Sequence, residues 1–173
     1  MITELISEGI VYSTAILDIL IILFIVLIIT KRELLNKYSR YFISVAFFTV
    51  LASIFGSLFY SEILKYPPCT LCWYQRIFMY PQIIILGIGI ILKDKRSVIY
   101  SFVLSFFGLI ISTYQYLIQL GMTENYGICS LTGSALDCST NFFTSMGYIT
   151  IPLMALSAFL FLTLLTGFLI LRK

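Results

Sequence analysis

The sequence has 173 residues, of which 60% are hydrophobic and only 11% are charged, and its mean hydropathy is +1.03. A soluble domain of this size would need far more polar surface, so the composition predicts a membrane protein. The net charge of +3 does not indicate nucleic-acid binding, because the basic residues lie in short clusters between apolar runs. The absence of histidine excludes histidine-ligated haem or zinc and catalysis by histidine.

Five apolar stretches are long enough to cross a hydrocarbon core of about 30 Å, which takes about 20 helical residues. A backbone in lipid must satisfy its hydrogen bonds internally, and the stretches lack the period-two alternation of barrel strands. Each is therefore predicted to be a helix, and the fold an all-α membrane bundle. The predicted spans are Ile10–Thr30, Phe42–Ser61, Trp73–Leu92, Ser97–Met122 and Met146–Leu171.

Lysine and arginine gather on one predicted side of the membrane, which the positive-inside rule makes cytoplasmic. Nine of the eleven basic residues lie there: Lys31, Arg32, Lys37, Arg40, Lys93, Lys95, Arg96, Arg172 and Lys173. The N-terminus carries Glu4 and Glu8 and no early basic residue, so it is predicted to lie outside and does not resemble a secretory signal. The loops after the second and fourth spans, which contain the four cysteines, are then extracytoplasmic.

The most informative segment, Tyr66–Arg76, reads Tyr-Pro-Pro-Cys-Thr-Leu-Cys-Trp-Tyr-Gln-Arg. Its two prolines prepare a helix start, which places Cys69 near the N-terminus of the third span. Partial positive charge there stabilises a thiolate, and Cys-x-x-Cys pairs at such positions exchange readily with other thiols. Arg76 follows Cys72 by four residues and shares its helix face, where a cation can stabilise a thiolate or a reduced quinone.

A second pair, Cys129 and Cys138, lies with eight residues between its members in a loop rich in Gly, Ser and Thr. A disulfide in such a loop is accessible to a macromolecular partner. Two pairs on one face of a bundle, one of them beside an apolar helix start, suggest an electron relay. Electrons would enter at the loop pair, pass to Cys69 and Cys72 by thiol–disulfide exchange, and leave to a lipid-soluble acceptor.

These features are similar to those of a known family. The sequence Cys69-Thr-Leu-Cys72-Trp-Tyr-Gln-Arg76 at the start of a membrane helix resembles the DsbB family of disulfide-forming membrane proteins. The continuation Ile77-Phe-Met-Tyr80-Pro81 and the later Gly147-Tyr-Ile-Thr-Ile-Pro152 look most like its shorter BdbC-type members. The resemblance covers about Phe42 to Leu171, and it implies a four-helix bundle.

The resemblance implies a path for electrons through the cysteines of this chain. Cys129 would form a mixed disulfide with a thioredoxin-fold, DsbA-like thiol oxidase, and Cys138 would exchange with Cys69. Cys72 would lie beside a membrane quinone, ubiquinone or menaquinone, which Arg76 contacts. The implied activity is that of a quinone-dependent protein-disulfide oxidoreductase, a monomer in the bacterial cytoplasmic (inner) membrane with its cysteines on the extracytoplasmic face.

The chain departs from the family in its first span. The four helices of the family core correspond to residues 41–173, whereas residues 1–40 add an N-terminal membrane helix and a cytoplasmic loop. The resemblance gives this helix no role. Its Asp18 is an acid within a membrane span, which supports a transporter with a proton relay as an alternative, although that alternative depends on a single residue.

Three further interpretations compete for the cysteines. Structural disulfides are common outside the cytoplasm, but a membrane bundle needs no such staple. A four-cysteine zinc site fits the Cys-x-x-Cys half, but the spacing of the other pair is poor and an oxidising environment works against thiolates. A vitamin K epoxide reductase-like protein also has two cysteine pairs and a quinone, but its spaced pair comes first, and the order here is reversed.

Overall fold

The computed structural model describes residues 2–31, 33, 35, 38–123, 144–145 and 148–171. Within this part of the chain, five helices are long and apolar enough to cross a membrane. They are α1 (Ile2–Thr30), α3 (Phe42–Leu58), α4 (Thr70–Leu92), α5 (Arg96–Gln119) and α6 (Ile151–Leu171). The prediction of an all-α, multi-pass membrane protein is therefore confirmed.

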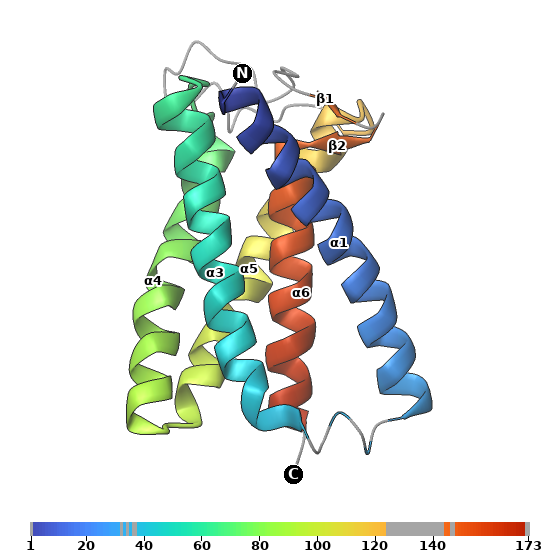
Figure 1. Ribbon diagram of the computed structural model, residues 1–173, viewed down its shortest axis with the longest axis vertical. Helices are drawn as coiled ribbons and strands as arrows, with labels where there is room; N and C mark the ends of the chain where they lie inside the picture. Colours follow the sequence, from blue (N-terminus) through green and yellow to red (C-terminus); the bar gives the residue numbers. More distant parts are fainter. Residues whose placement is uncertain are drawn as a thin grey trace.

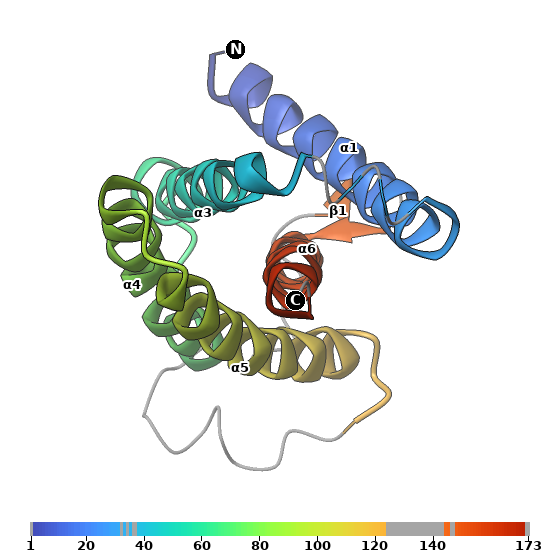
Figure 2. The same cartoon turned by 90° about the horizontal axis from the view of Figure 1, so that it is seen from below.

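The five helices alternate in direction (Figure 1). The end at which α4 begins and α5 ends also holds the N-terminus, and we call it the cysteine end. The opposite end carries Lys31, Lys93 and Lys95 in its connections. Helices α3, α4, α5 and α6 form a four-helix bundle in which α6 packs on α3 and α5, whereas α1 lies outside this bundle against α6 (Figure 2).

The boundaries of the helices differ from the predicted spans where polar residues continue a helix or a strand interrupts one. Helix α1 begins at Ile2 rather than Ile10, because helices extend through polar residues as well as apolar ones; the Ser7 hydroxyl donates to the Glu4 carbonyl, 2.8 Å away. Helix α3 continues as the π-helical turn η2 (Phe59–Ile63), and the 3-10 turn η1 (Ser39–Tyr41) precedes α3. Helix α6 begins at Ile151 rather than Met146, because β1 (Thr144–Ser145) and β2 (Ile149–Thr150) pair as antiparallel strands.

Two interactions hold α1 against the bundle. The carboxylate of Asp18 accepts a hydrogen bond of 2.5 Å from the hydroxyl of Ser157 on α6, which is buried. One and a half turns further along α1, the ring of Phe24 lies in a group of aromatic rings that also contains Phe42 of α3 and Phe168 of α6, with centroids 5.7 and 6.0 Å away. Asp18 thus has a partner within the protein and a role in helix packing.

The bundle core is centred on α6, where Phe159 and Leu162 are fully buried in one cluster with Val50 of α3 and Leu86 of α4. Helix α5 approaches α6 closely at Gly108. A Cβ atom at this glycine would lie only 2.2 Å from the ring of Phe159, so no larger residue fits without displacing that ring. Because Phe159 also lines the cavity described below, this contact fixes one wall of the site.

We expect Gly108→Ala to lower the free energy of unfolding by about 1–3 kcal/mol, because overpacking in a close-packed core forces side chains out of their preferred positions. Thermal unfolding of the purified protein in detergent would measure the change. The matched control is Gly9→Ala on α1, where no atom lies within 4 Å of the added methyl group and where alanine favours the helix. Equal melting temperatures for both variants and the wild type would contradict the expected packing contact.

Candidate active site

Cys69 is the residue that caps the start of α4, as the two preceding prolines predict. Its backbone is extended (φ −71°, ψ 170°), and its sulfur accepts a hydrogen bond from the backbone N–H of Cys72, 3.4 Å away. Cysteine here takes the position that serine or aspartate usually fills at a helix N-terminus. The geometry places both cysteines of the Cys-x-x-Cys segment in the first turn of α4, with Cys69 buried and Cys72 half-buried.

The two sulfur atoms lie 3.0 Å apart as free thiols, and a pair of glutamines holds them. The side-chain nitrogen of Gln115, on α5, lies 3.2 Å from the sulfur of Cys69 and 3.3 Å from that of Cys72 and donates to both. Gln75, on α4, donates in turn to the side-chain oxygen of Gln115 at 2.7 Å. Both glutamines are buried, so neighbouring helices orient the amide that contacts the cysteines.

The pKa of the Cys69 thiol is raised, first by its hydrogen bond with Cys72 and then by burial. Burial disfavours the charged form of any thiol, and a proton shared between two sulfurs leaves one of them neutral. Cys69 therefore keeps its proton to higher pH than an ordinary thiol. This differs from the prediction that the helix N-terminus stabilises a thiolate at Cys69: the backbone hydrogen bonds at that end do lower its pKa, but by less.

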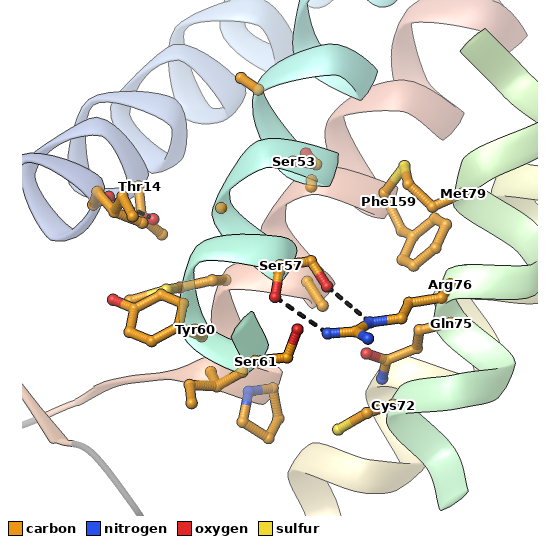
Figure 3. Close-up of a pocket in the computed structure, with 18 of the residues that line it drawn as sticks. Thr14, Ser53, Ser57, Tyr60, Ser61, Cys72, Gln75, Arg76, Met79 and Phe159 are labelled. Atoms are coloured by element: carbon orange, nitrogen blue, oxygen red, sulfur yellow. Dashed lines mark hydrogen bonds between the residues drawn. The ribbon is translucent and has the colours of Figure 1, made fainter. Parts of the chain in front are cut away.

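Arg76 extends from α4 toward α3 (Figure 3). Its Nε donates to the hydroxyl of Ser57 at 2.9 Å, and its Nη2 donates to the carbonyl oxygen of the same residue at 3.0 Å. The guanidinium also lies over the ring of Trp73, 5.4 Å from the centroid. Two of the five N–H donors of the arginine are thus used, and the other three have no partner among the residues that the structure describes.

Cys72 and Arg76 both line a cavity of about 530 Å³ between the helices. Gln75 and Gln115 join these two residues at the cysteine end, and the wall, which is mainly apolar, extends along α3 as far as Val45. Cavities of this size that are mostly apolar with a few convergent polar groups are typical of small-molecule sites.

The cavity also contains a polar atom without a partner. The hydroxyl of Tyr80, one turn beyond Arg76 on α4, is buried and makes no hydrogen bond with any residue that the structure describes. A buried hydroxyl without a partner is costly, and such exceptions in folded proteins are often found at functional sites.

The predicted site residues are only partly brought together in the described structure. Cys69, Cys72 and Arg76 lie at one site, whereas Cys129 and Cys138 lie outside the described residues. The chain that follows those two cysteines returns to the bundle at β2, where the hydroxyl of Thr150 donates to the side chain of Gln119 at 2.8 Å.

Three residues at the site, Gln75, Gln115 and Tyr80, were not predicted from the sequence. A polar side chain in a membrane helix marks an inward-facing position, so the two glutamines carried a usable signal. The signal does not identify their partners, because Gln115 follows Cys69 by 46 residues.

Comparisons with known proteins agree with this geometry. The family model described as "Disulfide bond formation protein DsbB" matches residues 39–169, which is most of the chain. The chain belongs to the DsbB family. Membership gives it a role in disulfide bond formation, as an oxidoreductase embedded in the membrane. The match begins after the end of α1, so α1 lies outside the region that the DsbB model describes.

Relatives of DsbB type cover a similar part of the chain. The "Probable disulfide formation protein C 2" of Bacillus anthracis is 41% identical over 126 residues, which are 73% of this chain and 88% of that protein. The "SPbeta prophage-derived disulfide bond formation protein B" of Bacillus subtilis (strain 168) is 43% identical over 121 residues, or 69% and 79% of the two chains. The "Probable disulfide formation protein" of Oceanobacillus iheyensis is 44% identical over 120 residues, or 68% and 80%. No solved structure gives a significant match.

We expect the alkylation rate of Cys69 in the reduced protein to rise only above about pH 8.5, the ordinary pKa of a thiol, because its raised pKa delays formation of the thiolate. In Cys72→Ala, which removes the largest cause of the shift, the rise should occur at lower pH. Iodoacetamide labelling followed by mass spectrometry measures the alkylation rate against pH for both proteins. The accessibility of the thiol changes the maximum rate but not the pH at which the rate rises. A wild-type rise centred below pH 8.5 would contradict the assignment.

We expect Gln115→Leu to make the reduction potential of the Cys69–Cys72 pair more negative by about 20–40 mV. The reduced sulfurs accept N–H donors better than disulfide sulfurs do, and losing about 1–2 kcal/mol of hydrogen bonding destabilises the dithiol by that amount. Equilibration with glutathione buffers gives the potential. Thr113→Val is the control, because Thr113 is exposed on the same helix and its hydroxyl donates to the backbone carbonyl of Leu109, one turn earlier. An unchanged or less negative potential in Gln115→Leu would exclude this role.

Proposed function

We propose that the protein reoxidises an extracytoplasmic, thioredoxin-fold thiol oxidase of DsbA type and transfers the electrons to a membrane quinone. The observation that carries this proposal is the shared cavity of Cys72 and Arg76, in which a redox-active thiol and a partly free guanidinium line one largely apolar space. A structural disulfide would need neither the cavity nor the cation. A lipid-soluble acceptor with polar oxygens would use both.

The residues of the cavity fit a quinone ring. The unused N–H donors of Arg76 could bind a carbonyl oxygen of the ring. Arginine retains its charge in an apolar setting, so it can stabilise negative charge as the ring is reduced. The apolar walls supply contact for the rest of the ring.

The proposed reaction is a series of dithiol–disulfide exchanges in which each step moves two electrons. The thiols of the partner reduce the Cys129–Cys138 disulfide, and the two resulting thiols reduce the Cys69–Cys72 disulfide. The Cys69–Cys72 dithiol, the form described here, then closes to the disulfide and releases two electrons and two protons. A quinone held in the cavity beside Cys72 and Arg76 would be the acceptor of these two electrons and two protons.

Cys69 and Gln115 have distinct roles in the last step. Cys69 has the raised pKa and keeps its proton longer, whereas Cys72 lies one turn from Arg76 on the same face of α4. Gln115 donates to both sulfurs and keeps them within 3.0 Å of each other, close to the arrangement in which the disulfide forms. Gln75 fixes the orientation of the Gln115 amide.

We place the cysteine end of the bundle outside the cytoplasm, in the bacterial cytoplasmic membrane. Lys93 and Lys95 lie at the opposite end of the helices, in agreement with the positive-inside rule. An oxidising compartment at the cysteine end is also the condition under which disulfides persist and a thiol oxidase needs to be reoxidised.

The proposal is tested by adding a reduced thioredoxin-fold oxidase and a quinone to the purified full-length protein and following quinone absorbance. We expect one quinone to be reduced for each partner disulfide formed, and Cys72→Ser to abolish the reaction. A folded wild-type protein that oxidises the partner without reducing quinone would exclude a quinone as the acceptor.

In the same assay we expect Arg76→Ala to raise the KM for quinone about tenfold or more. The change removes a charge-assisted hydrogen bond worth roughly 1.5–3 kcal/mol. Arg76→Lys should raise the KM less, because lysine keeps the charge but not the two-pronged geometry. Exchange between the two cysteine pairs should change less than quinone reduction. Arg96→Ala, at the opposite end of the bundle, is the control, and a KM for Arg76→Ala equal to that of Arg96→Ala would leave Arg76 with a packing role alone.

We expect Cys138→Ser to accumulate a mixed disulfide between Cys129 and the partner oxidase, because no neighbouring thiol remains to release the partner. Non-reducing electrophoresis and peptide mapping detect the adduct and its position. The double variant Cys129→Ser, Cys138→Ser should give no adduct. Trapping of the partner on Cys69 would reverse the proposed order of the two pairs.

A further inference from the structure

Helix α1, which lies outside the region shared with the DsbB family, forms part of the wall of the cavity. Ile10, Ser13, Thr14 and Leu17 line it, and their spacing of three and four residues places them on one face of α1. Figure 3 shows Thr14 on the side of the cavity opposite Arg76. The additional helix therefore covers a side of the site that α3 and α6 alone would leave facing lipid.

The position of this wall is fixed by two contacts in the second half of α1. Asp18, one residue beyond Leu17, is hydrogen-bonded to Ser157 of α6, and Phe24 packs among the aromatic rings of α3 and α6. Breaking a hydrogen bond to a carboxylate inside a membrane is costly. The lining segment of α1 is thus anchored directly beside its last cavity residue.

A second cavity, of about 670 Å³, lies between α1 and α3 and adjoins the first. The two share four lining residues, Ile10, Ser13, Ala52 and Gly56. Small residues line both helices here: a Cβ built on Gly56 would be in van der Waals contact with Cγ2 of Ile10, 4.0 Å away, whereas nothing lies within 4 Å of one built on Gly9.

The second cavity leads to the lipid-facing surface. Its wall includes Phe55 and Ile63 of the α3 segment, whose side chains are 64% and 57% exposed. The two adjoining cavities, which we call the passage, extend from Arg76 to exposed apolar side chains between α1 and α3. Its charged side chains are Arg76 in the first cavity and Glu62 in the second.

We propose that this passage binds the isoprenoid tail of the quinone, with α1 as the wall that encloses it. The inference rests on the proposed function, because a ring held at Arg76 carries a long apolar tail that must lie against apolar side chains. The second cavity, which adjoins the first at Ser13 and Ala52, offers such a surface. Tail contacts with α1 make this helix a determinant of quinone affinity and of preference for tail length.

The location of the tail can be tested without turnover. A quinone analogue with a diazirine in the first part of its tail is photolysed with the full-length protein in lipid nanodiscs, and adducts are mapped by mass spectrometry. We expect adducts in the segments 6–13 and 52–63, competed by unmodified long-tailed quinone. Adducts confined to α4, α5 or α6, or adducts that excess quinone does not reduce, would overturn the proposal.

Affinity provides a second test, because Trp73 is the only tryptophan of the chain and lies against Arg76, where a bound quinone would quench its fluorescence. We expect Ser13→Phe and Ala52→Phe, which fill the passage from either side, to weaken binding of a long-tailed quinone about tenfold, the effect of losing burial of a few methylene groups. Binding of the same ring without a tail should change less than twofold. Ile16→Phe, on the exposed side of α1, is the control and should resemble the wild type.

The outcomes separate this inference from the proposed function. If neither quinone quenches Trp73 of the wild-type protein in a saturable way, the proposed function fails. If the wild type binds both quinones and Ser13→Phe weakens both equally, or neither, the ring site stands and the passage is not the tail site. Thermal unfolding of each variant shows whether it retains the wild-type fold.

Discussion

A polar side chain inside a membrane needs a hydrogen-bond partner within the protein, because hydrocarbon offers none. In the described part of the chain, the hydrogen bonds that meet this requirement connect neighbouring elements of the fold. The pairs are Asp18 with Ser157, Ser57 with Arg76, Gln75 with Gln115, Gln82 with Ser101 and Ser105, and Gln119 with Thr150. The contacts that orient the helices are thus the same contacts that direct an arginine and an amide toward the cysteines.

Helix α4 carries most of this arrangement, because adjacent residues on a helix point in directions about 100° apart. Gln75 points to α5 and supports the amide that contacts the sulfurs, whereas Arg76 points to α3 and reaches the cavity. Two turns further on, Gln82 is fully buried and accepts hydrogen bonds from Ser101 and Ser105 of α5. That second contact holds α4 to α5 and leaves the first turn of α4 in a fixed place between its two neighbours.

The sequence predicts those parts of the site that depend on local geometry. Two prolines before a cysteine indicate a helix start, and the spacing of Cys72 and Arg76 places them on one face in any α-helix. Contacts between distant segments could not be predicted from the sequence. Gln115, for example, contacts Cys69, which precedes it by 46 residues. The direction of the Cys69 pKa shift was also predicted wrongly. The hydrogen bond with Cys72 and burial, both properties of the folded chain, raise this pKa by more than the backbone hydrogen bonds of the helix N-terminus lower it.

The hydrogen bond between Asp18 and Ser157 also has a consequence for the order in which the protein is assembled. Its two partners are separated by 139 residues, so at synthesis rates of about 5–20 residues per second roughly 7–28 s pass between the appearance of the acid and that of its serine. During that interval α1 has no α6 on which to dock, and its carboxyl group lacks the hydroxyl that binds it in the finished protein. Docking of α1 is accordingly a late event that follows insertion of the last helix, and the cavity gains its enclosing wall only when synthesis is nearly complete.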